Sequence, residues 1–272
     1  MASGICHRAA AAGVNWWIGL LIAVVLVPAG LRGQDPPQVP SASPQRPAAT
    51  PPEISLEERA DIFMARKAYA DAVDYYQRAL KQIGFASAPI WNKLGIAQQQ
   101  QGNYRLARKA YNEALHRRKE FSEAWNNIGT TYFLENKYAK SIKYYLRSLQ
   151  LNPSSAPVHL NLGTAYYHKK KYAAAVEEYR QALSLDPKVL TERATLGSVM
   201  QTRSVDAQYY FYLAKVFASL GRAEDSVRYL RRALEDGFED LKRIKEDEDF
   251  QKISQFPAFV ELLNNPPVPI KQ

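Results

Sequence analysis

Apolar positions recur with a helical spacing through most of the chain. From Trp125 to Tyr132 the apolar and small residues stand at i, i+3, i+4 and i+7, which is one face of a helix. A second stripe with the same spacing runs from Tyr138 to Leu149, after a polar break at Asn136–Lys137. Asn152–Pro153 ends this stripe, because proline disfavours the helical conformation in the residue before it. The pattern predicts two short helices joined by a turn.

The same pair of stripes returns at a fixed offset of 34 residues. Gly129 corresponds to Gly163, and Pro153 corresponds to Pro187. A constant period of this length indicates an array of structural repeats, and no strand pattern interrupts it. The 34-residue period, extended in both directions over residues 53–240, predicts five units and one insertion (190–206). The units are 53–86, 88–121, 122–155, 156–189 and 207–240.

Small residues occupy equivalent places in these units. Gly95, Gly129, Gly163 and Ala214 share one position of the predicted first helix. A small side chain there lets two helices approach closely, and a larger one would overpack the contact. We expect the large aromatic residue of a neighbouring unit to fill the remaining space.

These residues resemble the tetratricopeptide repeat, whose pattern is W-x2-L-G-x2-Y followed by A, an aromatic residue, A and P. The second unit matches it with Trp91, Leu94, Gly95, Ala107, Tyr111 and Ala114. The resemblance covers roughly 53–240 and implies an all-α, right-handed α-solenoid of about five helix-turn-helix repeats. We expect residues 241–272 to form a helical cap and tail, because the end of a solenoid exposes its core.

The resemblance also implies a function. Proteins of this family are non-enzymatic scaffolds or adaptors that bind a protein or peptide partner on the concave surface of the array. First-helix residues line that surface, and asparagine amides there can both donate to and accept from a peptide backbone. An alternative is that the asparagines bond a neighbouring helix. The implied partner-binding residues are Asn92, Lys93, Gln99, Asn126, Asn127, Thr130, Phe133, Asn161, Thr164, Tyr167, Phe211, Tyr212 and Lys215. Among them, Phe133, Tyr167 and Phe211 would supply apolar anchors.

Nothing in the sequence indicates catalysis. It contains no Gly-rich phosphate loop, no HExxH and no CxxC motif, and its four histidines are scattered. The only cysteine is Cys6, so a thiolate metal site is excluded. We therefore expect no catalytic residue, no metal and no cofactor.

The net charge of +9 raises another class of partner. Lysines and arginines cluster at 117–119, at 137–143 and at 169–171. We do not expect nucleic acid as a partner, because an exported protein rarely meets it. We call these three clusters the basic rim. The alternative to a peptide-binding scaffold is a module whose basic rim binds an anionic envelope polymer or a membrane surface.

The N-terminal residues predict export. An apolar run from Trp16 to Val27 is followed by small residues, as in a secretory signal peptide, which we place at 1–33. The alternative is an uncleaved anchor in the inner membrane. Residues 34–52 contain seven prolines and predict an extended, disordered linker. We expect a periplasmic or secreted protein of a bacterial cell envelope.

Overall fold

The computed structural model describes residues 54–190 and 206–269, and within these residues every regular element is a helix. The predicted signal peptide, the predicted linker and residues 191–205 of the insertion lie outside the described residues. The helices are α1 (Leu56–Ala65), α2 (Tyr69–Gln82), α3 (Ala88–Gln100), α4 (Tyr104–Arg117), α5 (Ser122–Leu134), α6 (Tyr138–Leu151), α7 (Ala156–His168), α8 (Tyr172–Leu185), α9 (Ala207–Ser219), α10 (Ala223–Glu235), α11 (Leu241–Glu246), α12 (Glu248–Gln251) and α13 (Pro257–Asn264).

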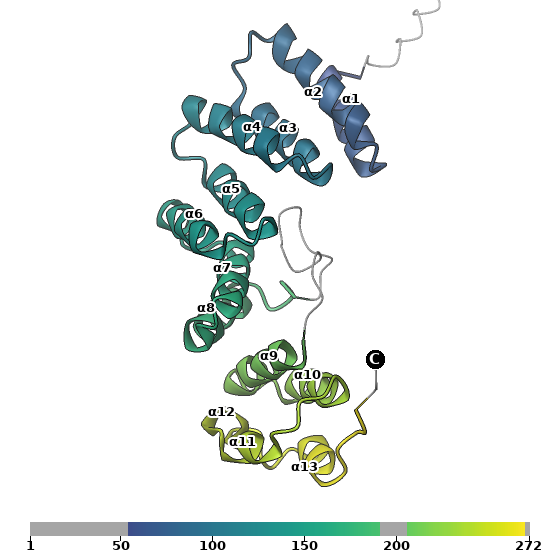
Figure 1. Ribbon diagram of the computed structural model, residues 1–272, viewed down its shortest axis with the longest axis vertical. Coiled ribbons are helices and arrows are strands. Elements are labelled where there is room, and N and C mark those ends of the chain that lie inside the picture. The colour runs from purple at the N-terminus through teal and green to yellow at the C-terminus, as the bar shows by residue number, and fades with distance from the viewer. Residues whose placement is uncertain (1–53, 191–205, 270–272) are drawn as a thin grey trace, which may run out of the picture. The chain divides into compact units, whose positions relative to one another are not determined.

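The first ten helices pack as consecutive pairs, which we number as repeats one to five. Repeat one is α1 with α2, and repeat five is α9 with α10 (Figure 1). The second helix of each repeat also contacts the first helix of the next repeat, and α3 contacts α5 as α5 contacts α7. The chain is therefore an all-α solenoid of helix pairs, and the fold class predicted from the period is confirmed.

A glycine beneath a tyrosine holds each of the middle repeats together. A Cβ atom added to Gly163 would lie 2.6 Å from Cε1 of Tyr179, and one added to Gly129 would lie 2.7 Å from Cδ1 of Tyr145. Real Cβ contacts are longer, so only glycine fits beneath the ring. The tyrosine belongs to the second helix of the same repeat. Our expectation of an aromatic residue from a neighbouring unit was wrong, because the tight turn brings the second helix back across its own glycine.

The turn inside each repeat uses one left-handed residue. The position is occupied by Lys67, Gly102, Asn136, Lys170 and Gly221, whose φ angles lie between 58 and 76°. In repeat four the N–H of the following residue, Lys171, donates to the carbonyl of Tyr166 at 2.9 Å. This bond satisfies one of the carbonyls left open at the end of a helix and reverses the chain.

The C-terminal helices pack against repeat five. α12 contacts α9, and α13 contacts α10. Ile244, Phe250 and Phe259 are buried in one cluster with the apolar residues of α9 and α10. These helices therefore cover apolar surface that the last repeat would otherwise expose.

Candidate protein-interaction surface

The thirteen residues implied by the resemblance lie on the first helices α3, α5, α7 and α9. We call the side of the repeats that they form the first-helix surface. Most of their side chains are buried. The polar and the aromatic residues of the set are buried against different parts of the chain.

Four asparagines form a continuous hydrogen-bonded line, the amide row. Asn127 Nδ2 donates to Asn92 Oδ1 at 3.0 Å, which joins α5 to α3. Asn126 Nδ2 donates to Asn127 Oδ1 at 3.2 Å, and Asn161 Nδ2 donates to Asn126 Oδ1 at 3.0 Å. The row therefore bonds three consecutive first helices to one another. The structure therefore shows asparagines that bond neighbouring helices, which was the alternative to peptide binding. In these bonds Asn126 and Asn127 each use one of their two amide protons.

Buried tyrosine hydroxyls connect the second helices to this surface. Tyr111 donates to Gln99 Oε1 at 3.0 Å, and Tyr145 donates to the Thr130 hydroxyl at 3.3 Å. Tyr179 lies 3.4 Å from the Thr164 hydroxyl in the same relation. Burial raises the pKa of Tyr145 and Tyr179 above the usual value, because a phenolate would be poorly solvated there. These hydroxyls therefore stay protonated and donate hydrogen bonds to the polar side chains of the first helices.

The expected apolar anchors are not exposed. Phe133, Tyr167 and Phe211 are all buried. The ring of Phe211 stacks on Phe238 with centroids 4.4 Å apart, and the Tyr167 hydroxyl donates to the Asp206 carboxylate. The structure thus corrects the sequence-based expectation of open aromatic anchors, because neighbouring elements of the chain cover these rings.

The two lysines of the set, Lys93 and Lys215, bind carboxylates of their own chain. Lys93 Nζ lies 2.8 Å from Glu57 and 2.7 Å from Asp61. Burial alone would lower the pKa of Lys93, but the bonds to Asp61 and Glu57 outweigh it and raise the pKa. Lys215 is paired in the same way with two aspartates of the C-terminal helices.

Beside Lys93 the first-helix surface has an open hollow of about 690 Å³. Helices α1, α2 and α3 line it, with Asp61, Tyr76, Lys93 and Ile96 among its walls. Asn92, the first residue of the amide row, precedes Lys93 on α3 but is not among the residues that line this hollow. Sequence reasoning missed the hollow, because no motif marks the space between two repeats.

A smaller hollow of about 240 Å³ lies among basic side chains of the rim. It is lined by Lys137 and Lys169, from the turns of repeats three and four, and by Lys140, from α6. Lys137 is paired with Glu135 at 2.9 Å, while Lys140 and Lys169 are exposed. The turns thus bring together two basic clusters that are separate in the sequence.

The described residues also bear on the other chemistry that the sequence raised. Within 54–190 and 206–269, no three acidic, histidine or cysteine residues are grouped as a metal site. The His159 ring lies 2.7 Å from Glu178 and 2.9 Å from the Pro153 carbonyl. It therefore links α7 to α8 and to the loop after α6. In the same residues, no helix is both long enough and apolar enough to span a membrane.

Comparison with known proteins agrees with this architecture. The sequence model of the tetratricopeptide repeat family matches residues 92–156, and a second model of that family matches residues 156–189. Residues 92–189 are thus tetratricopeptide repeats. Repeats of this family are protein-interaction scaffolds, and this is the general function of the array. No curated protein matches the chain.

Solved structures of other repeat proteins are similar to the chain. A crystal structure of MamA has 19% identity and a TM-score of 0.46, and the match covers 68% of this chain and 96% of MamA. MamA from Desulfovibrio magneticus RS-1 has 15% identity and a TM-score of 0.47, with 71% and 96% covered. TTC0263, a repeat protein of Thermus thermophilus, has 18% identity and a TM-score of 0.47, with 70% and 94% covered.

Proposed function

We propose that this protein is a scaffold or adaptor that binds an extended peptide segment of a partner protein along the first-helix surface of repeats two to four. The observation that supports the proposal is the amide row. Its hydrogen bonds hold the side-chain amides of Asn126 and Asn127 in fixed orientations while each keeps a second proton. Groups held in place before binding lose less conformational entropy when a ligand arrives.

We propose that the peptide enters from the hollow beside Lys93. A peptide that enters there meets first the paired charges of Lys93 and Asp61 and then the amides. An amide both donates and accepts, so it can bond a peptide backbone whatever the side chains of the peptide are. Phe133 and Phe211 are not part of this site, because both are 0% exposed, whereas Asn126 and Asn127 keep 8% and 5% of their surface exposed.

A pull-down with the full chain tests the proposal. Envelope extract is passed over the wild type and over the double variant Asn127→Ala with Asn161→Ala, at low and at high salt. We expect a partner that the wild type retains at high salt and the double variant loses. Hydrogen bonds in a shielded groove are screened little by salt, whereas contacts between exposed charges are screened strongly.

The control is Ser148→Ala. Ser148, on the second helix α6, donates a buried hydrogen bond to the Ser122 carbonyl at 2.8 Å. Loss of this bond destabilises the repeat and leaves the amide row unchanged. Retention of the partner by this variant would show that lost stability is not the cause. If the double variant binds the partner as tightly as the wild type does, the amide row is not the binding site.

The meeting of Lys137, Lys140 and Lys169 at one hollow supports a second candidate function. In this alternative the basic rim binds an anionic envelope polymer or a membrane surface. Such binding would weaken steeply with salt and would be indifferent to the asparagine substitutions. The charge reversal Lys140→Glu with Lys169→Glu would abolish it.

We also propose that the protein is exported, with residues 1–33 as signal peptide, and that it acts in the bacterial cell envelope. The apolar run from Trp16 to Val27 supports this, since about 12 helical residues reach only about 18 Å and match a signal peptide better than a membrane span. Fusion of residues 1–52 to a reporter that is active only after export tests it. An inactive reporter would contradict export, and an active but uncleaved one would indicate an anchor.

A further inference from the structure

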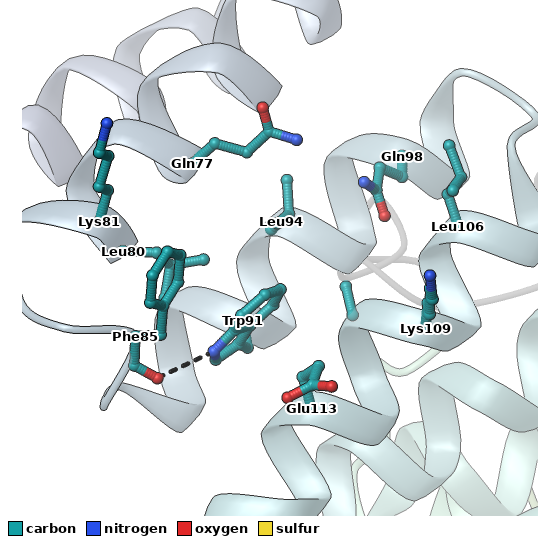
Figure 2. Close-up of a pocket in the computed structure, with 11 residues that line it drawn as sticks. Gln77, Leu80, Lys81, Phe85, Trp91, Leu94, Gln98, Leu106, Lys109 and Glu113 are labelled. Atoms are coloured by element: carbon teal, nitrogen blue, oxygen red, sulfur yellow. Dashed lines mark hydrogen bonds between the residues drawn. The ribbon is translucent and has the colours of Figure 1, made fainter.

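A second open pocket lies between repeats one and two, and it shares no residue with the first-helix surface. Its volume is about 480 Å³, and α2, α3, α4 and the loop after α2 line it. Figure 2 shows Trp91 and Leu94 along one wall and Leu106 and Lys109 on the facing wall, with Gln98 between them. The apolar lining consists of Leu80, Phe85, Trp91, Leu94, Leu106 and Ala110.

Gln98, one of the residues that line this pocket, carries a buried acceptor without a partner in the described part of the chain. Its side chain is only 7% exposed, and its Oε1 atom has no hydrogen-bond partner among the described residues. The Gln98 side chain lies between the two walls of the pocket (Figure 2). A buried acceptor without a partner destabilises a fold, so such atoms are few and call for an explanation. A donor supplied by a ligand would provide one.

The aromatic wall is fixed before any ligand arrives. Trp91 Nε1 donates to the Phe85 carbonyl at 3.1 Å, and the two rings stack with centroids 6.2 Å apart. The guanidinium carbon of Arg117 lies 5.1 Å from the centre of the Trp91 ring. Phe85 and Leu106 remain 45% and 42% exposed, although both are large and apolar. The pocket is therefore a preformed apolar recess with exposed edges, which is typical of a binding site.

The charges at the pocket are positive on balance. Glu113 is bound by Arg117 at 2.6 Å, so its charge is neutralised within α4. Lys81 on α2 and Lys109 on α4 line the pocket, and neither forms an ion pair with any carboxylate of residues 54–190 and 206–269. An occupant with apolar and acidic groups complements this arrangement.

We infer that this pocket docks an acidic, apolar peptide segment of a partner protein, and that the Gln98 amide turns toward the recess to accept an N–H from the backbone of the segment. A large apolar side chain of the segment occupies the recess between Trp91 and Leu106. Carboxylates on either side of it lie near Lys81 and Lys109. A fatty-acid anion would satisfy the apolar and charged parts but has no donor for Gln98, so the peptide fits better.

A displayed library of random peptides, selected on the full chain, tests this inference. We expect enriched peptides with a large apolar residue flanked by Asp or Glu. Their dissociation constants are then measured by fluorescence anisotropy with wild type, Gln98→Leu and Leu106→Arg. Gln98→Leu should weaken binding about tenfold, because the peptide N–H loses its acceptor. Leu106→Arg should block the recess. Gln181→Leu, the same exchange as at Gln98 but on the exposed face of α8, should leave binding unchanged.

Methylation of the peptide nitrogens sharpens the test. One N-methyl position should weaken binding to the wild type about tenfold and should have no further effect on Gln98→Leu, because both changes remove the same hydrogen bond. Gln98→Leu should also raise the melting temperature, since it removes an unpartnered polar atom from the fold. Enrichment of no acidic, apolar motif would overturn the inference, as would equal binding by the wild type and both pocket variants. Loss of binding in Asn127→Ala with Asn161→Ala instead would assign the peptides to the first-helix surface.

Discussion

Repeats four and five place different side chains at the same positions of the helix pair. Gly163 and Tyr179, which pack together in repeat four, correspond to Ala214 and Leu230 in repeat five, which are buried in one cluster. Asn161, which belongs to the amide row, becomes Tyr212, which receives a hydrogen bond from Arg243 at 3.0 Å. The helix pair thus keeps its packing while its first helix changes from a polar, self-bonded face to an aromatic face that the C-terminal helices cover.

The difference shows that one repeat position can serve two purposes. In repeat four, the Thr164 hydroxyl accepts a hydrogen bond from the hydroxyl of Tyr179, which is on the second helix of the same repeat. In repeat five the equivalent residue is Lys215, which binds Asp247 and Asp249 of the C-terminal helices at 2.5 and 3.3 Å. Positions that line a candidate binding surface in the middle of the array therefore hold the end of the chain in place at its last repeat.

The largest effect on this comparison should come from Gly163→Leu. Because even a Cβ atom would lie 2.6 Å from the Tyr179 ring, the larger side chain must push α7 and α8 apart. We expect the free energy of unfolding to fall by about 3 kcal/mol, the upper end of ordinary overpacking. Urea denaturation measures it, with the exposed Ala173→Leu on α8 as control, for which a change within about 0.5 kcal/mol is expected. An unchanged midpoint in Gly163→Leu would refute the packing scheme.

Lys215→Met should separate repeat five from the C-terminal helices. The ion pair of Lys215 with Asp247 is partly buried. We therefore expect the substitution to lower the free energy of unfolding by about 1–2 kcal/mol. Lys242→Met, which removes a lysine from a highly exposed pair with Glu246, is the control and should change little. The measurement is denaturant unfolding, followed by the protease sensitivity of α11 to α13. Equal effects of the two substitutions would contradict the role of Lys215.

The same site predicts a response to acid. Burial alone would raise the pKa of Asp249, but Lys252 and Lys215 outweigh it and hold the pKa below its usual value. A carboxyl group whose pKa is lowered by folding stabilises the fold above its unfolded pKa, and this stabilisation is lost as pH falls through the folded pKa, below about 4. We expect the wild type to lose stability as the pH falls below that value, and Lys215→Met to lose less over the same interval. Denaturant unfolding at a series of acidic pH values measures the difference.

Exchanging the packing pair of repeat four for that of repeat five tests whether the two are equivalent. Gly163→Ala alone should overpack, and Tyr179→Leu alone should leave a cavity and lose the contact with Thr164. The double variant reproduces Ala214 with Leu230, so its loss of stability should be smaller than the sum of the single losses by about 1 kcal/mol. Melting curves of the four proteins give the coupling. Additive losses would mean that the ring and the small residue do not depend on each other.

The smallest effect should come from Lys170→Gly, which gives the turn of repeat four the residue that repeat five has at Gly221. Lys170 has φ 58°, where a side chain is disfavoured. We expect a gain of about 0.5–1 kcal/mol after the greater chain entropy of glycine is included. The neighbouring Lys169→Gly, at φ −84°, should instead destabilise the protein. A loss in both variants would show that the left-handed residue is not strained.

The amino-acid sequence by itself determined the helix pairs and their period. Trp125–Tyr132 and Tyr138–Leu149 fall within α5 and α6, because an apolar stripe at helical spacing must be buried on one side. The period also contained the amide row, since Asn92 and Asn126 stand 34 residues apart, as do Asn127 and Asn161. The bonds of the row join Asn92 to Asn127 and Asn126 to Asn161, which stand 35 residues apart and become neighbours once the pairs stack.

Only the tertiary structure decided what each of these positions contacts. The sequence could not show that Tyr179 returns to its own glycine, that Phe211 is covered by Phe238, or that Gln98 lacks a partner beside an open recess. A periodic pattern reports which face of a helix is apolar, and it reports this from residues a few places apart. Burial and hydrogen-bond satisfaction depend on side chains tens of residues away, whose arrival is fixed by how the helices pack.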